Sequence, residues 1–187
     1  MVASPKDAIE HFKRAISLGN GNACGELSLI YQGPREMLPF EMQLVGPSKQ
    51  AFELATRGHE MGSVISTSAL ARCYLEGVGV PQHIERSSQL ARTAARAGDS
   101  LGMHLLARCL EIEGKAGRKE IFEWYRRAAS LGHTDSAACA RKYEPPAHFG
   151  AVYVNAYDDR DFDDFEFEPI PFKFAPSDES NPKRRKP

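Results

Sequence analysis

The chain has 187 residues, and its 24 basic and 25 acidic side chains leave a formal net charge of −1 at pH 7. Near neutrality argues against a dedicated nucleic-acid binder. Hydrophobic residues make up 42% of the chain and charged residues 26%, which is the balance of a folded globular protein and excludes a wholly disordered one. We therefore expect one packed domain and a tail.

The start of the chain and its cysteines indicate a compartment. Residues 1–7 carry neither the basic nor the apolar segment of a secretory signal, and no run of residues approaches the ~18 apolar residues of a membrane span. The cysteines are far apart and form no C-x-x-C pair that would hold a metal or perform redox chemistry. We expect a cytoplasmic protein with four buried free thiols: Cys24, Cys73, Cys109 and Cys139.

The first predicted helix begins at Ser4-Pro5, an N-cap serine followed by a proline in the first turn. It ends in an alanine-rich stretch closed by Gly19, and glycine is the usual residue of a left-handed helix cap. The same helix end recurs at three later glycines: Gly62, Gly98 and Gly132. The first interval is 43 residues and the next two are 36 and 34, so the first has room for an inserted loop, which we place at residues 33–47.

Another apolar helix follows each of these glycines. Its predicted N-caps are Asn20, Asp99 and either Thr134 or Asp135. The four related helices contain Leu27-Ser28-Leu29-Ile30-Tyr31, Leu70-Ala71-Arg72-Cys73-Tyr74, Leu106-Ala107-Arg108-Cys109-Leu110 and Ala140-Arg141-Lys142-Tyr143. Glycine-containing breakers at residues 77–81 and 114–117 each precede another amphipathic pattern. The sequence therefore predicts about four stacked helix pairs.

The segment Leu70–Val80 matches the L-(G/A)-x-x-Y-x-x-G-x-G-V signature of the Sel1-like repeat family, a relative of the tetratricopeptide repeats. Ala94–Gly98 and Trp124–Gly132 resemble the W-x-x-x-A-A-x-x-G end of that repeat. The resemblance covers about residues 4–144 and implies an all-α fold, a right-handed α/α solenoid. It also implies a partner-binding scaffold with a variable concave side. Cysteine-rich extracellular members pair cysteines within each repeat, which this chain does not, so an intracellular member is favoured.

At Pro145-Pro146 the helical pattern stops, and we divide the chain into a repeat domain at 4–144 and an extended, non-helical tail at 145–187. The repeat domain has a net charge of +2 and the tail −3, with seven acids and one base between residues 150 and 170. Acids alternate with aromatic rings there, whereas disordered segments are usually poor in aromatics. We interpret the segment as a docking strip, for a partner or for the chain's own repeats, with four aromatic binding residues: Phe162, Phe165, Phe167 and Phe172.

Two chemical sites were weighed and disfavoured. The acidic strip is not a calcium loop, because Asp164 stands where an EF-hand has Gly and Ile170 where it has Glu. His104 and Cys109 lie on one predicted helix, where a base and a nucleophile could pair. Five residues of helix turn them about 140° apart, which disfavours a hydrogen bond. We therefore expect no catalytic residue, no metal and no cofactor.

Arg72, Arg108 and Arg141 occupy the same position in three repeats, 36 and 33 residues apart. Stacking of the repeats aligns them, and a column of guanidinium groups favours carboxylates. The hypothesis is that this column binds an acidic strip. That strip is either residues 158–168 of this chain or an acidic surface of a partner.

The sequence therefore predicts a non-catalytic protein-interaction scaffold or adaptor without nucleic-acid or membrane contact. Two alternatives remain open: an inhibitor or immunity-type protein that blocks an enzyme's active site, and an enzyme based on a Cys/His pair. The basic end at Lys183–Lys186 resembles a nuclear import signal, which would apply in a eukaryotic chain.

Overall fold

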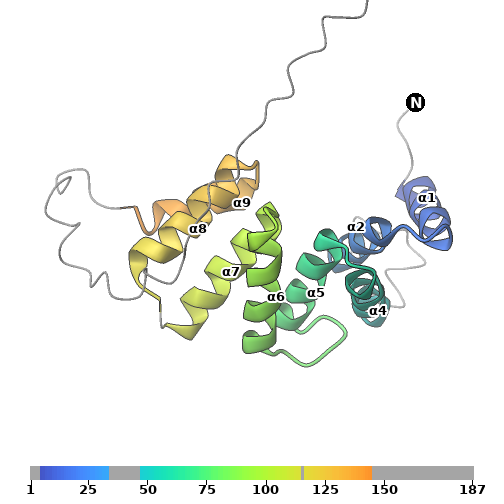
Figure 1. Ribbon diagram of the computed structural model, residues 1–187, viewed down its shortest axis with the longest axis horizontal. Helices are drawn as coiled ribbons and strands as arrows, with labels where there is room; N and C mark the ends of the chain where they lie inside the picture. Colours follow the sequence, from blue (N-terminus) through green and yellow to red (C-terminus); the bar gives the residue numbers. More distant parts are fainter. Residues whose placement is uncertain (1–4, 34–46, 115, 145–187) are drawn as a thin grey trace, which may run out of the picture. The chain divides into compact units, whose positions relative to one another are not determined.

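The computed structural model describes residues 5–33, 47–114 and 116–144. These residues form helices and no strand, which confirms the all-α prediction. The helices, labelled in Figure 1, are α1 (Pro5–Ser17), α2 (Gly21–Gln32), α4 (Ser48–Glu60), α5 (Val64–Glu76), α6 (Ile84–Arg96), α7 (Ser100–Glu113), α8 (Arg118–Ser130) and α9 (Thr134–Arg141). Most of the predicted loop at 33–47 lies outside the described residues. So does the tail, including Phe162, Phe165, Phe167, Phe172 and the basic end.

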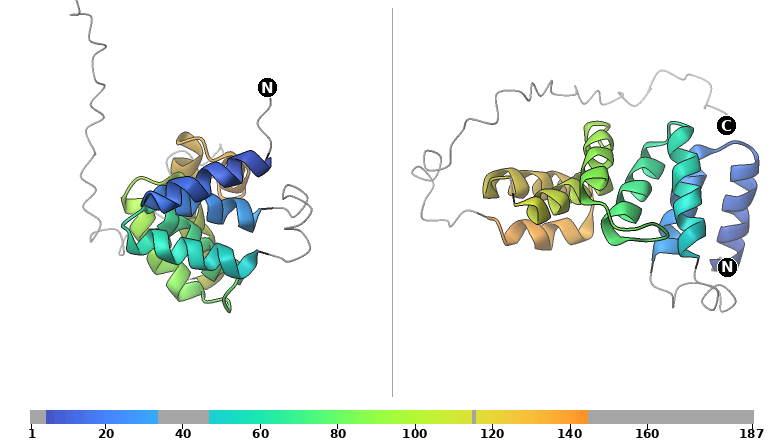
Figure 2. Two further views of the ribbon diagram at one scale, coloured as in Figure 1. Left: turned by 90° about the vertical axis from the view of Figure 1, so that its right-hand side faces the viewer. Right: turned by 90° about the horizontal axis from the view of Figure 1, so that it is seen from below.

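The helices pack as antiparallel pairs that follow one another along the chain (Figure 2). We call α2, α5, α7 and α9 the first helices, and α1, α4, α6 and α8 the second helices. Each first helix packs against the second helix before it, and α2 also packs against α5, as α5 does against α7. No comparable packing joins α1 to α4 or α4 to α6 within the described helices. The first helices α2, α5 and α7 therefore pack directly against one another, whereas on the second-helix side the helices are spread apart.

The glycines predicted to end the helices have the expected backbone: Gly19, Gly62, Gly98 and Gly132 have φ angles of 85°, 79°, 87° and 91°. The two glycines of the Gly-x-Gly signature are required for different structural reasons. Gly77 caps α5 in the left-handed conformation, donating its N–H to the Cys73 carbonyl. Gly79 has a φ of 71°, and a Cβ atom there would lie 2.2 Å from the Ser48 carbonyl oxygen at the start of α4. The loop after α5 therefore tolerates no side chain at Gly79.

The N-caps predicted after the glycines are confirmed in two of three places, whereas Ser4, the predicted N-cap of the first helix, lies outside the described residues. The Asn20 side chain accepts from the Ala23 N–H at 3.2 Å, and Asp99 Oδ2 accepts from the Gly102 N–H at 2.7 Å. The prediction for α9 is wrong, because Thr134 and Asp135 already lie inside the first turn of that helix. His133 stands at the cap position, and no side chain there caps a backbone N–H.

Buried apolar side chains run through the whole stack in three clusters, of which the largest joins α5, α6, α7 and α8 around Leu106 and Tyr125. All four cysteines are free thiols, and three of them are fully buried, as predicted: Cys24, Cys73 and Cys109. Cys139 is only partly buried. No helix among those described is long and apolar enough to cross a membrane.

Candidate protein-interaction surface

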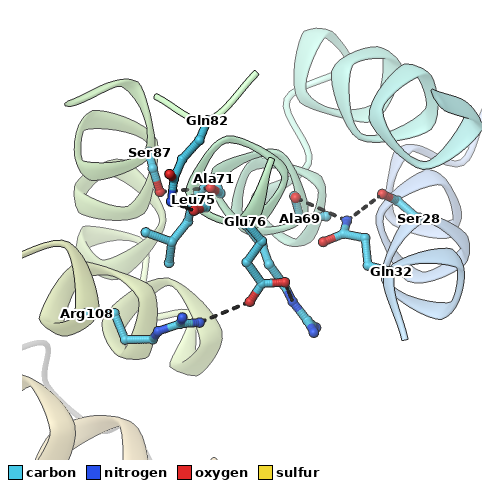
Figure 3. Close-up of polar contacts among 10 residues, drawn as sticks. Ser28, Gln32, Ala69, Ala71, Leu75, Glu76, Gln82, Ser87 and Arg108 are labelled. Atoms are coloured by element: carbon cyan, nitrogen blue, oxygen red, sulfur yellow. Dashed lines mark hydrogen bonds and ion pairs between the residues drawn. The ribbon is translucent and has the colours of Figure 1, made fainter. Parts of the chain in front are cut away.

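Two of the three predicted arginines meet on one carboxylate between α5 and α7. Arg72 Nε contacts Glu76 Oε2 at 3.2 Å, one turn further along α5, and Arg108 Nη1 reaches across from α7 to Glu76 Oε1 at 3.0 Å. Figure 3 shows Arg108 extended toward Glu76. The side chains of Arg72, Arg108 and Glu76 are 31%, 38% and 29% exposed, so this cluster remains open to solvent. We call these three residues the Arg–Glu–Arg cluster.

The helix that presents this cluster is fixed from both sides by side chains that bind its carbonyl groups (Figure 3). From α6, Ser87 Oγ donates to the Ala71 carbonyl at 2.8 Å, and Gln82 Nε2, just before α6, donates to the Leu75 carbonyl at 2.6 Å. From α2, Gln32 Nε2 donates to the Ala69 carbonyl at 3.2 Å. The Leu75 carbonyl lies in the last turn of α5, where the helix offers no partner of its own. These bonds hold α5 in register with its neighbours.

The charge of the cluster favours an anion. Two guanidinium groups face one carboxylate, which leaves one net positive charge on a surface that is only partly hydrated. Each guanidinium carries five N–H donors and uses one of them in its bond to Glu76. The geometry of the guanidinium fork matches a carboxylate, so a partner carboxylate can compete with Glu76 for the same arginines.

The third predicted arginine is not part of this cluster. Arg141 lies exposed in the last turn of α9, and no ion pair joins it to Glu76 in the described part of the chain. Sequence reasoning also missed Glu76 itself. Its position four residues after Arg72 is a recognised signal for an ion pair on a helix.

The alternative Cys/His pair does not assemble. His104 Nδ1 is hydrogen-bonded to Ser136 Oγ at 2.8 Å, whereas Cys109 Sγ donates to Ser87 Oγ at 3.3 Å. Burial raises the pKa of the Cys109 thiol and lowers that of His104, which favours an uncharged thiol and an uncharged imidazole. Among the described residues no group of three or more His, Cys, Asp and Glu side chains is placed to hold a metal ion.

The buried thiols give a direct chemical test of this arrangement. Burial raises the pKa of Cys73 to about 12 from its ordinary value of 9.0, so its thiolate fraction at neutral pH falls about a thousandfold. We expect iodoacetamide to modify Cys139 first, and Cys24, Cys73 and Cys109 only after unfolding. Mass spectrometry of alkylated peptides, with and without guanidinium chloride, measures this order. Fast modification of Cys109 in the native protein would contradict it and favour the enzyme.

Stacked helix pairs with a left-handed glycine at each recurring helix end define an α-solenoid repeat protein. A family model described as the Sel1 repeat matches residues 2–20, 65–99 and 122–133. In these three segments the chain is similar to Sel1 repeat proteins, which generally mediate protein–protein interactions. A search of curated protein sequences gives no match.

Two solved structures have a similar fold. A Sel1 repeat protein from Oxalobacter formigenes is 19% identical, with a TM-score of 0.55, and the match covers 74% of this chain and 54% of that one. A protective antigen present in uropathogenic Escherichia coli strains, which displays an SLR fold, is 24% identical with a TM-score of 0.55. That match covers 81% of this chain and 31% of the antigen. The chain therefore spans about half of the first structure and a third of the second.

Proposed function

We propose that this protein is a non-catalytic scaffold or adaptor that binds a carboxylate-bearing partner at the Arg–Glu–Arg cluster. The observation that carries the proposal is the shared carboxylate: Glu76 holds two arginines from different repeats side by side at a partly exposed surface. A partner carboxylate that takes the place of Glu76 on either guanidinium gains a charge-assisted hydrogen bond without having to order the arginine first.

The chemistry of the partner follows from the charge of the Arg–Glu–Arg cluster. A partner segment rich in Asp or Glu fits a cluster with one net positive charge, and residues 158–168 of this chain have that composition. Binding of these residues to the chain's own repeats would make the tail a competitor of the partner. The inhibitor alternative uses the same surface and differs only in that the partner is an enzyme.

Substitutions that remove either the negative charge or the positive charges of the cluster test the proposal. We expect Glu76→Gln to strengthen binding of an acidic partner by roughly threefold to tenfold, because it removes the competing carboxylate. The double variant Arg72→Gln/Arg108→Gln is expected to weaken binding by at least about tenfold and to reduce its dependence on salt. A partner captured by the full chain and then purified serves for the measurement, with Kd determined by titration calorimetry at several salt concentrations.

Opposite effects separate binding from folding, since a general loss of structure would weaken binding in both variants. Arg14→Gln/Arg126→Gln is the matched control, because it removes the same charge from the exposed arginines of α1 and α8. An unchanged Kd and salt dependence in Arg72→Gln/Arg108→Gln would contradict the proposal. A loss of affinity in Glu76→Gln as large as in the arginine variant would also contradict it.

A further inference from the structure

Among the described residues, two related grooves open where the second helices are spread apart. The first, of 430 Å³, lies between α1 and α4 and has Leu27 and Tyr31 of α2 in its lining. The second, of 450 Å³, lies between α4 and α6 and has Leu70 and Tyr74 of α5. Each is within the size range of ligand-binding pockets. Helix α4 is the wall that they share. Another groove, of 620 Å³, lies along α6 beside Glu113 of α7 and shares Gln89 and Thr93 with the second of the two related grooves.

The two grooves are the same structural site repeated once. Leu70 and Tyr74 stand 43 residues after Leu27 and Tyr31, which is the interval between the first two repeats. On the opposite walls, Leu90 of α6 stands 36 residues after Leu54 of α4, the interval of the next repeat. The same offsets relate the other lining residues of the second groove to residues of the first: His59, Arg86, Gln89 and Thr93 follow Ile16, Gln50, Glu53 and Arg57.

Both grooves combine an apolar interior with a positive rim. Leu27, Leu54 and Ile16 line the first groove. Its rim cations are Arg57 and Lys13, of which Lys13 also pairs with Glu10 at 2.8 Å, and Glu53 is the carboxylate of the lining. In the second groove the rim cation is Arg86, whose guanidinium carbon lies 5.7 Å from the centre of the Tyr74 ring. An apolar or aromatic side chain flanked by carboxylates is complementary to such a groove.

We propose that these grooves together bind one extended segment of a partner protein, which places a large apolar side chain in each groove and carboxylates beside the rim cations. The repetition favours a continuous chain over a small molecule, because two equivalent grooves across a single helix give two anchors in one segment. Linking two anchors makes the second contact intramolecular and raises the affinity above that of either groove. This surface is separate from the Arg–Glu–Arg cluster, which joins the first helices α5 and α7.

A peptide with residues 161–172 of this chain is a suitable probe, because it alternates four phenylalanines with five carboxylates. Gln50 lines the first groove and Gln89 the second, and both side chains are exposed, so tryptophan at either position fills a groove without disturbing the core. We expect Gln50→Trp and Gln89→Trp each to weaken binding of the labelled peptide to the full chain about tenfold, and the double variant to abolish it. Fluorescence anisotropy measures the Kd.

Three controls test which features of the peptide and of the grooves cause the loss of binding. A peptide with its phenylalanines replaced by alanine is expected to lose binding, and one with Asn and Gln in place of its acids is expected to bind more weakly and with less dependence on salt. Arg126→Trp, on the exposed face of α8, adds an indole away from both grooves and is expected to leave the Kd unchanged.

The acidic probe also separates this proposal from the proposed function. If the probe binds at the Arg–Glu–Arg cluster, Arg72→Gln/Arg108→Gln removes binding and the tryptophan variants do not, which overturns the grooves as the site. Binding by the alanine peptide as tight as by the original overturns the apolar anchors. Binding that appears only after Phe162, Phe165 and Phe167 of the full chain are replaced by alanine overturns a partner segment in favour of the chain's own.

Discussion

Replacing Gly58 with alanine is expected to lower the free energy of unfolding by about 2 kcal/mol, although alanine normally stabilises a helix relative to glycine. Gly58 is buried where α4 lies against both α2 and α5. A Cβ atom there would come within 2.0 Å of Ser66 Oγ, 2.7 Å of Ser66 Cβ and 2.8 Å of Cys24 Cβ. The helices must move apart to admit the methyl group, and they then lose packing along their whole contact. Urea unfolding followed by circular dichroism measures the change.

The next repeat supplies a compensating variant. Ala94 occupies the position of Gly58 there, and Gly102 occupies that of Ser66, so the glycine stands on the opposite helix of the crossing. Ser66→Gly combined with Gly58→Ala copies that arrangement. The double variant is expected to be more stable by about 1 kcal/mol than the sum of the two single effects. Strictly additive effects would show that the two positions do not interfere, and would contradict the crossing geometry.

The repeat pattern sufficed to predict the helix pairs because each boundary depends on local chemistry. A left-handed cap needs glycine, and an N-cap needs a short polar side chain, so Gly98 and Asp99 mark a boundary wherever they stand in the fold. The α9 boundary was misplaced for the same local reason. Three consecutive residues, His133, Thr134 and Asp135, all have side chains that can cap a helix. The residue at the cap position is His133, one residue before Thr134, the nearer of the two predicted caps.

The candidate site was predicted only in part, because a column of equivalent residues does not specify its partners. Arg72 and Arg108 do come together, yet they do so on Glu76, whose counterpart in the α7 repeat is Ile112, an exposed apolar residue. The environments of His104 and Cys109 also depend on contacts that are distant in sequence. Their partners, Ser136 and Ser87, lie 32 and 22 residues away on other helices.

The two grooves on the second-helix side were not predicted at all. Leu27, Tyr31 and their counterparts read as core positions of an amphipathic helix, and most of their surface is indeed buried. A groove forms above them because the second helices α1, α4 and α6 do not pack against each other, whereas the first helices α2, α5 and α7 do. The difference in helix spacing arises when the repeats stack, so the sequence of a single repeat does not predict it.

Acidification is expected to destabilise the C-terminal end of the stack through a pair of neutral histidines. The rings of His104 and His133 are stacked with their centres 4.3 Å apart, and Ser136 Oγ is hydrogen-bonded to Nδ1 of both, at 2.8 Å and 2.9 Å. Burial, and then the neighbouring His133, lower the pKa of His104 from 6.5 to about 4. Arg108 and Arg72 also disfavour a charge on His104, while Asp135 favours it. The pKa of His133 is lowered as well, chiefly by burial.

The direction of the pH effect follows from proton binding. Between pH 6.5 and 4 the unfolded chain holds a proton on His104 and the folded chain does not, so stability falls as the pH falls across this window. The full shift corresponds to a loss on the order of 3 kcal/mol. Below pH 4 the folded state binds the proton too, and His104 contributes no further loss.

Urea unfolding at intervals between pH 7 and pH 4.5 measures this effect, with amide hydrogen exchange reporting whether α9 opens first. His104→Gln removes the titrating group, and we expect it to be less stable than the native chain at pH 7 but to lose less stability on acidification. His11→Gln, at an exposed position of α1, is the matched control and is expected to retain the native pH dependence. A pH dependence as steep in His104→Gln as in the native chain would assign the acid sensitivity to other groups.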